Sequence, residues 1–161
     1  MTISEYNKSV EKYSDNLYRF VLKNIKDIDK AKDIVQDTFL KFWEKRENVD
    51  VSKSKSYLFT TAYHTLIDVV RREKKQGSFN DVKEENYSTQ TEYSDLQEIL
   101  HQAIEQLPED QKAVILLRDY EGYAYDEIAE ITGMTVSKVK VYIFRGRKFL
   151  KNYLVSVEAV I

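Results

Sequence analysis

The scarcity of proline and glycine is the feature that most restricts how this chain can fold. Its 161 residues include one proline and four glycines. Sheets need frequent turns, and turns are built largely around these two residues. Apolar residues instead recur at spacings of three and four along most of the chain, which is the pattern of a helix with one buried face. The sequence therefore predicts an all-α protein, and 42% apolar residues are enough to bury a core.

Three helices are predicted in the first 76 residues. They are expected over about 4–26, from an N-cap at about Asp29, and over about 54–75. Their buried faces are expected to consist of Tyr6, Val10, Tyr13, Leu17 and Phe20; of Ala31, Ile34, Val35, Thr38, Phe39, Phe42 and Trp43; and of Leu58, Ala62, Leu66, Val69 and Val70. Together the three helices predict a small helical domain over residues 1–76.

A second domain is predicted over residues 95–161, after a flexible linker at 77–94. The stretch QGSFNDVKEENYSTQTEYS, which begins at Gln76, is polar and acidic with little periodicity. Such a break usually separates domains. Beyond it, helices are predicted over about 92–106, 108–120, 125–131 and 135–154, with Pro108 separating the first two.

The last two predicted helices have the spacing of a helix-turn-helix. A tight crossing needs a small residue on the first helix, which Ala129 supplies. The turn needs a residue that tolerates positive φ, and Gly133 follows four positions later. Val139, six positions beyond the glycine, can pack back onto the first helix, and Val136 is expected to face inward with it.

The net charge of −2 hides a segregation of charge along the second domain. Five acids and no base occur between Asp119 and Glu130, whereas six bases and no acid occur between Thr135 and Leu154. Because an electrostatic footprint is local, the basic stretch indicates nucleic-acid binding despite the overall charge.

The outward face of the last helix carries the candidates for reading duplex DNA. A helix fits the major groove, where side chains of its N-terminal half reach base edges and flanking bases hold phosphates. Lys138, Val141 and Tyr142 are the base-edge candidates, and Thr135 or Ser137 can cap the helix beside them. The phosphate candidates are Lys140, Arg145, Arg147 and Lys148. The alternative is an ordinary solvated basic face.

A second cluster of bases ends the third predicted helix. Arg71, Arg72, Lys74 and Lys75 follow two turns after Tyr63 and His64. Aromatic and basic groups on one helix suit single-stranded or melted DNA, whose bases stack and whose phosphates need countercharge. Bases at a helix C-terminus are also favoured by the helix dipole, so the cluster alone is weak evidence.

At these motifs the sequence resembles the extracytoplasmic-function (ECF) sigma factors. Asp33–Trp43 resembles region 2.2, Tyr57–Arg72 is similar to regions 2.3 and 2.4, and Leu107–Leu154 resembles region 4. The resemblance implies a three-helix sigma2-like domain and a sigma4-like helix-turn-helix domain. It also implies a transcription initiation factor that reads the −10 element with the first domain and the −35 element with the second.

The resemblance also implies partners and contact residues. The second helix would dock on the β′ clamp helices of core RNA polymerase through Asp33, Gln36, Asp37, Leu40 and Trp43, and the polymerase β flap is a further expected contact. Arg71 and Arg72 would contact promoter DNA. An anti-sigma factor, often membrane-bound in this family, is expected to control the protein.

Several residues depart from the usual family pattern, and they fall where promoter sequence is read. They are His64 in place of a frequent asparagine, Lys138 of a threonine, Tyr142 of an arginine, Phe144 of a histidine and Thr132 of a leucine. The −35 sequence of a relative therefore does not transfer to this chain.

The composition indicates where the protein is located and which other classes of protein are excluded. The chain has no cysteine, no apolar run in its first residues and no apolar stretch long enough for a membrane span, so a cytoplasmic protein without a signal peptide or membrane insertion is expected. Its two histidines lie on separate predicted helices without metal-ligand spacing. We therefore expect no enzyme activity, cofactor, metal or small-molecule substrate. A free-standing helix-turn-helix regulator is the alternative, but it leaves Asp33–Trp43 unexplained.

Overall fold

The computed structural model describes residues 1–76 and 95–160, and every regular element in these ranges is helical. The predicted linker, 77–94, lies outside the described residues. The α-helices are α1 (Ile3–Ile25), α2 (Ile28–Lys45), α3 (Ser54–Lys75), α4 (Asp95–Glu105), α5 (Glu109–Ile115), α6 (Tyr125–Thr132) and α7 (Val136–Val160). No helix in the described ranges is both long and apolar enough to cross a membrane. The all-α prediction is confirmed.

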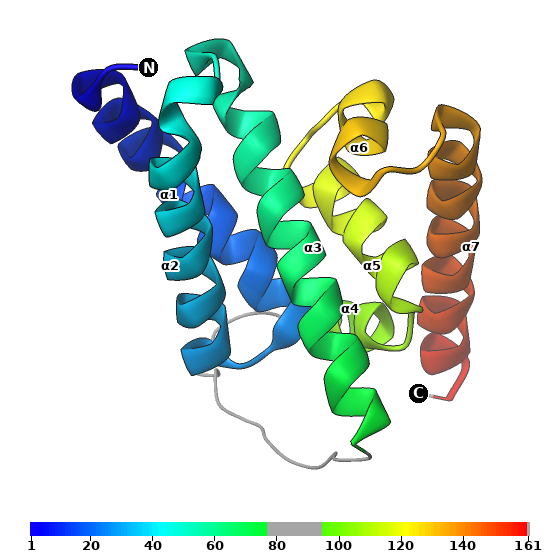
Figure 1. The fold of residues 1–161 in the computed structure, drawn as a ribbon. Helices are drawn as coiled ribbons and strands as arrows, with labels where there is room; N and C mark the ends of the chain where they lie inside the picture. Colours follow the sequence, from blue (N-terminus) through cyan, green and yellow to red (C-terminus); the bar gives the residue numbers. More distant parts are fainter. Residues whose placement is uncertain (77–94, 161) are drawn as a thin grey trace.

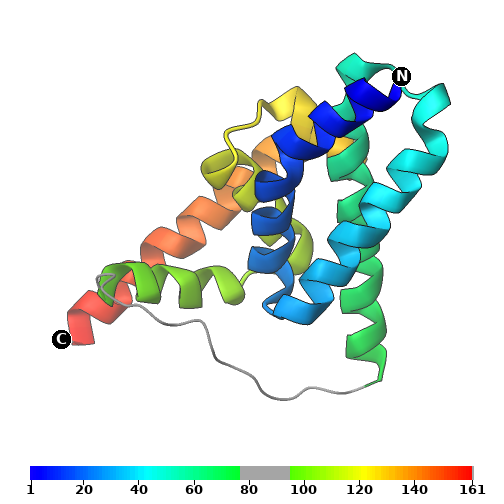
Figure 2. The same ribbon diagram turned by 90° about the vertical axis from the view of Figure 1, so that its left-hand side faces the viewer.

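The N-terminal half forms a three-helix group, and the C-terminal half packs against one side of it. Figure 1 shows α2 at one edge of the molecule, α3 in the middle and α7 at the opposite edge. Seen from the side, α1 and α2 cross in front of α3, while α4 and α7 extend away from them (Figure 2). The two halves therefore share one interface, built mainly by α3 and α6 and completed by α1 and α5.

Capping residues fix where the first two helices begin. The Thr2 hydroxyl accepts a hydrogen bond from the Glu5 backbone N–H at 3.1 Å, and the Glu5 carboxylate accepts one from the Thr2 N–H at 2.8 Å. The prediction that Asp29 caps α2 is wrong. Asp27 is the N-cap, because its side chain accepts from the Lys30 backbone N–H at 3.1 Å and places Asp29 inside the first turn.

The helix predicted over 108–120 changes character near its middle. The α-helical part ends at Ile115, and Leu116–Tyr120 continues as a π-helical turn. The wider turn lets the chain bend towards Gly122, whose φ of 76° suits glycine. The last helix is longer than predicted and extends to Val160 rather than ending near Leu154.

Helix α3 is buried on two adjacent faces, which the sequence did not separate. Leu58, Ala62 and Leu66 form the stripe predicted to be buried. A second buried stripe, one residue further along, contains Phe59, Tyr63 and Ile67. Phe59 packs between the halves, with its ring 5.6 Å from that of Phe20 on α1 and 5.2 Å, edge-on, from that of Tyr123 before α6. One hydrophobic cluster therefore runs through both halves.

A buried lysine also joins the halves. The side chain of Lys112, on α5, is only 3% exposed. Its ammonium group donates to the backbone carbonyl of Asn24 at the end of α1 at 2.9 Å, and to the Glu105 carboxylate at 3.3 Å. The C-terminal end of a helix carries partial negative charge, so this carbonyl is a favourable partner for a cation.

Candidate nucleic-acid interface

The helix-turn-helix forms as its spacing predicts. Gly133 adopts a left-handed conformation with φ 78° and ends α6, where its N–H donates to the Ala129 carbonyl at 2.9 Å. The Thr135 hydroxyl accepts from the Lys138 backbone N–H at 3.1 Å and so caps α7. Val139 is fully buried against this turn. Val136 is 39% exposed, contrary to the prediction that it faces inward, because it lies in the first turn of α7, ahead of the crossing.

The rest of α7 presents most of the predicted DNA-facing side chains to solvent. Val139, Ile143, Gly146 and Leu150 form the buried stripe that packs on α4–α6. The exposed residues include Thr135, Ser137, Lys138, Lys140, Val141, Arg145, Arg147 and Lys148, whereas Tyr142 is half-buried. The Lys138 ammonium lies 5.4 Å from the centre of the Tyr142 ring, which brings two of the base-edge candidates together.

Arg147 differs from the other basic residues of α7 because it has an internal partner. Its guanidinium forms two hydrogen bonds to Asp119 in the π-helical turn, at 3.2 Å from Nε and 2.5 Å from Nη2. These hydrogen bonds raise the pKa of Arg147 above its ordinary value. Arg145 and Lys148 have no acidic partner among the described residues, so their charges face solvent.

Phe144 is a surface residue that sequence reasoning did not place among the candidates. Its side chain is 69% exposed, more than any other large apolar side chain that the structure describes on α7. It lies three residues after Val141 and four before Lys148, so these side chains share the outer face of the helix. The sequence could have indicated Phe144 as a DNA contact, because it is an apolar residue on the outer face of an otherwise basic helix. Apolar side chains contact thymine methyl groups in the major groove.

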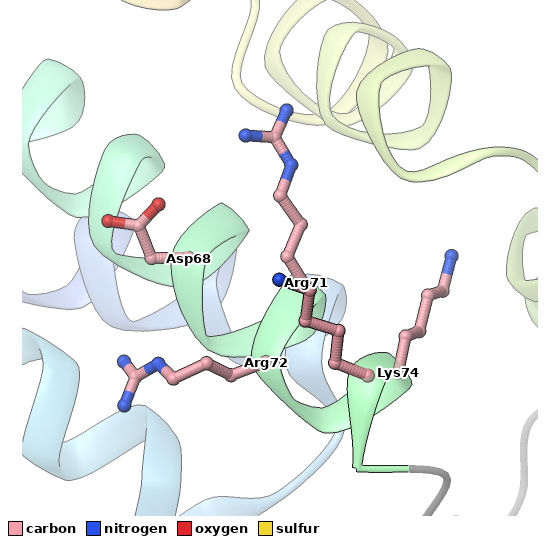
Figure 3. Close-up of a pocket in the computed structure, with 5 residues that line it drawn as sticks. Asp68, Arg71, Arg72 and Lys74 are labelled. Atoms are coloured by element: carbon pink, nitrogen blue, oxygen red, sulfur yellow. The ribbon is translucent and has the colours of Figure 1, made fainter.

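The basic cluster of α3 surrounds a hollow at the end of the helix. The hollow has a volume of about 620 Å³ and is lined by Asp68, Arg71, Arg72, Lys74 and Lys75. Arg71 and Lys74 extend to one side of α3 and Arg72 extends to the other, towards α2 (Figure 3). All four basic residues are exposed, so the hollow can accept an anionic group.

Tyr63 and His64, predicted beside this cluster, have opposite environments. His64 is exposed, with its ring 5.6 Å from that of Tyr63. Tyr63 is buried in the interface between the two halves, and this burial, more than the nearby Asp110, raises its pKa to about 12. Tyr63 is therefore covered in this arrangement, a fact that α3 alone could not reveal.

The outer face of α2 carries the predicted polymerase contacts. Asp33, Gln36 and Leu40 are exposed, and Asp37 is half-buried and paired with Lys41 at 3.0 Å. Leu40 is 55% exposed, and the other exposed large apolar residue of α2 is Ile28 in its first turn, at 47%.

Trp43 lies at the edge of this face and has packing partners of its own. Its ring is 5.0 Å from that of Tyr6, edge-on, and the Arg46 guanidinium stacks 3.6 Å above it. Trp43 is half-buried, so part of its ring supports the three-helix group and part is accessible.

Similar proteins identify the family to which this chain belongs. Residues 9–76 match the family described as Sigma-70 region 2, and residues 97–150 match Sigma-70, region 4. The chain is 33% identical over 145 residues to the RNA polymerase sigma factor SigV of Bacillus subtilis, covering 88% of this chain and 86% of the relative. It is 28% identical over 156 residues to the ECF RNA polymerase sigma factor SigM of the same organism, covering 94% of each.

The chain belongs to the ECF group of the sigma-70 family. Its structure is similar to that of the sigma factor RpoE of Bartonella quintana, solved in complex with the anti-sigma factor NepR. The TM-score is 0.81 at 26% identity, covering 94% of this chain and 98% of that chain. Helices α1–α3 are thus region 2 of this ECF sigma factor, and α4–α7 carry region 4.

The family establishes what the protein does at the level of its class. ECF sigma factors bind core RNA polymerase and promoter DNA and direct promoter recognition, and they have no catalytic activity. The predictions of an ECF sigma factor, of region 2 and region 4 domains in this order, and of a non-enzymatic role are confirmed.

Proposed function

We propose that this ECF sigma factor reads the −35 element with the outer face of α7 and the melted −10 element with α3, while α2 docks on the β′ clamp helices of core polymerase. The observation that carries the proposal is the exposed basic face of α7, held by a well-formed helix-turn-helix. We therefore expect the protein to act in the cytoplasm, where RNA polymerase acts.

For the −35 element, the proposal divides the outer face of α7 into two sets of residues. Lys138, Val141 and Tyr142 lie near the N-terminal end of α7, the part of a recognition helix that reaches base edges. Phe144 extends this set as an apolar contact for thymine methyl groups. The phosphate-binding residues are Lys140, Arg145 and Lys148, with Thr135 and Ser137 beside the backbone at the start of the helix. Arg147 would join them when its pair with Asp119 opens.

For the −10 element, the basic hollow at the end of α3 supports the proposal. Arg71, Arg72, Lys74 and Lys75 provide countercharge for phosphates on both sides of the helix. His64 and Tyr63 would provide rings on which unpaired bases stack. Tyr63 can do so only after region 4 moves away from α3, because region 4 covers it here.

For core polymerase, the exposed Leu40 and its polar neighbours support a protein-docking role of α2. Asp33, Gln36 and Asp37 surround Leu40 on one face, an apolar centre with a polar rim. Trp43 borders the face. Region 4 would in turn contact the β flap, as the family resemblance implies.

An anti-sigma factor is the remaining proposed partner. The similar RpoE structure was solved with the anti-sigma factor NepR bound, which supports control of this chain by a protein of the same class.

The decisive test of the −35 assignment is transcription with core polymerase from a library of promoters. Replacing Lys138 or Tyr142 with alanine should re-rank promoters, because each base contact contributes about 1–3 kcal/mol of discrimination. Lys151→Ala, at an exposed position further along α7, is the matched control and should leave the ranking intact. An unchanged ranking for both Lys138→Ala and Tyr142→Ala would refute base readout by these residues.

The α2 assignment is tested by binding to core polymerase. Asp37→Arg should abolish binding while the helical circular dichroism spectrum is retained, because it places a cation in the middle of the docking face. Glu11→Arg, an equal change of charge at an exposed position of α1, is the control and should bind normally. Normal transcription by the Asp37→Arg protein would show that the docking face lies elsewhere.

A further inference from the structure

Among the described residues, three ion pairs cross the interface between region 2 and region 4. Lys26, at the C-terminal end of α1, lies 3.3 Å from Glu105 of α4, and the other two pairs are shorter. Arg19 of α1 forms a two-pronged pair with Glu121, at 3.0 Å from Nε and 2.9 Å from Nη2. Lys55 of α3 donates to Glu127 of α6 at 2.6 Å, and its ammonium lies 4.4 Å from the centre of the Tyr123 ring. In all three pairs the base comes from region 2 and the acid from region 4.

The environment of Glu121 makes its pair more than a surface contact. Its side chain is 1% exposed, whereas that of Arg19 is 45% exposed. A carboxylate removed from water is strongly unfavourable unless a cation pairs with it, and Arg19 supplies that cation from the other region. Loss or reversal of one partner would leave an uncompensated buried charge in the closed arrangement, so such a change should favour separation of the regions.

The pairs account for part of the acidic stretch between Asp119 and Glu130. Glu121 and Glu127 face region 2, and the hydrogen bond from Lys55 lowers the pKa of Glu127, which remains charged at neutral pH. Asp119 instead pairs with Arg147 inside region 4. The segregation of charge along the sequence thus places acids of region 4 against bases of region 2.

The closed arrangement covers one surface of region 2 and leaves another open. It buries Phe59 and Tyr63 on α3 and engages Lys55 on the same helix. The outer face of α2, with Leu40 at its centre, remains exposed at the opposite edge of the molecule (Figure 1). The surface proposed for polymerase is therefore accessible while part of the surface proposed for melted DNA is not.

We propose that region 4 is an intramolecular cover for the DNA-binding side of α3, held closed by the Arg19–Glu121 and Lys55–Glu127 pairs and opened after α2 has docked on polymerase. This inference rests on the proposed roles of α2 and α3. It assigns the acids of region 4 a task separate from −35 recognition: they occupy bases of region 2 until the two regions separate.

The first experiment measures opening directly, without polymerase. The chain has no cysteine, so Ser52→Cys, three residues before Lys55, and Glu130→Cys, three residues after Glu127, provide unique exposed positions for a pair of spin labels on the two sides of the interface. The wild-type background should give one short, narrow distance distribution at low ionic strength. Glu121→Arg with Glu127→Lys should shift it to longer and broader distances, because two attractions become repulsions, and the open-to-closed ratio should rise at least about fivefold.

Charge exchange separates the pairs from a general loss of folding. Adding Arg19→Glu and Lys55→Glu to the double variant restores opposite charges across the interface and should restore the short distance. Lys8→Glu is the matched control: Lys8 is an exposed lysine of α1 without an acidic partner in the described ranges, so the distance should not change. A short distance that persists in the Glu121→Arg/Glu127→Lys protein, or a long one in the wild-type background, would overturn the proposal.

The second experiment adds core polymerase to the labelled wild-type background and to the Glu121→Arg/Glu127→Lys protein. Binding should lengthen the distance in the first and change it little in the second. A complex that forms with the short distance retained would refute opening on polymerase. If no complex formed at all, the proposed α2 docking would fail, whereas the distances measured without polymerase would still decide whether the two pairs hold the cover closed.

Discussion

Gly146 of α7 lies directly against the side chain of Ile115 on α5. A Cβ atom placed on Gly146 would come within 2.8 Å of Ile115 Cγ1 and 2.9 Å of Cδ1, closer than such atoms approach in proteins. Ile115 is itself buried, so its side chain cannot move out into solvent to make room. The absence of a side chain at position 146 is therefore what lets the recognition helix pack closely on its support.

Gly146→Ala should lower the free energy of unfolding by about 1 kcal/mol. Overpacking of a buried contact costs about 1–3 kcal/mol, and the better helix propensity of alanine offsets about 1 kcal/mol of it. Urea denaturation checks the value. Ile115→Ala creates the missing room, so the double variant should be more stable than the sum of the two single changes implies. Strict additivity would show that the two residues do not compete for space.

Gly133→Ala should destabilise the protein through its backbone alone. An added Cβ at Gly133 meets nothing within 4 Å, but the φ of 78° costs a non-glycine residue about 1–2 kcal/mol. Gly133→Asn should cost less, because asparagine tolerates this conformation better. Thermal unfolding of the two variants checks the order. Equal stability of the alanine variant and the wild type would mean that the turn relaxes to negative φ.

Asp119→Asn should strengthen promoter binding by releasing Arg147. The arginine is paired inside region 4 by two hydrogen bonds, and without the carboxylate its charge becomes available to a phosphate. Holoenzyme affinity should rise, and the slope of log affinity against log salt concentration should steepen by up to about one unit. Adding Arg147→Ala should cancel the gain. A gain that survives Arg147→Ala would trace the effect to the lost acid rather than to the freed base.

His101 should make the stability depend on pH in the mildly acidic range. Burial on α4, followed by the nearby Lys23 and Lys26, lowers the pKa of His101 from its usual 6.5. The unfolded chain then takes up a proton at a higher pH than the folded chain, so the free energy of unfolding should fall as the pH drops below about 6.5.

Urea denaturation at a series of pH values checks this effect. His101→Gln should flatten the dependence in that range. His64→Gln changes the only other histidine, which is exposed on α3, and should leave the dependence unchanged. Flattening by the His64 variant but not by the His101 variant would contradict the assignment.

Local features of the fold were predictable because their causes are local. The scarcity of turn residues, the apolar periodicity and Pro108 were enough to predict the helices, and the bounds of α3 were predicted correctly as Ser54–Lys75. Gly133 and Thr135 could be assigned to the turn and the cap because positive φ and free N–H groups restrict the residue type. Asp27 was missed because two aspartates two residues apart are equally good caps in sequence.

The packing of the two regions was not predictable, for a physical reason. Phe59, Tyr63 and Tyr123 have the composition of a domain's own core, and nothing in their spacing shows that they face another domain. Tyr63 beside a basic cluster predicts stacking on bases, yet the same ring also suits a buried interface. Arg147 presented the same difficulty, since its partner Asp119 lies 28 residues earlier in the chain.

The buried ammonium group of Lys112 has a consequence for the geometry of docking. Apolar surfaces such as those of Phe59 and Tyr123 attract without direction, so by themselves they would allow region 4 to slide or rotate on region 2. The hydrogen bond of a buried ammonium group is directional, and displacement by even one turn of helix would take Lys112 away from the Asn24 carbonyl, leaving it only its partners within region 4. Lys112 thus favours one register of region 4 on region 2 whenever the two regions come together.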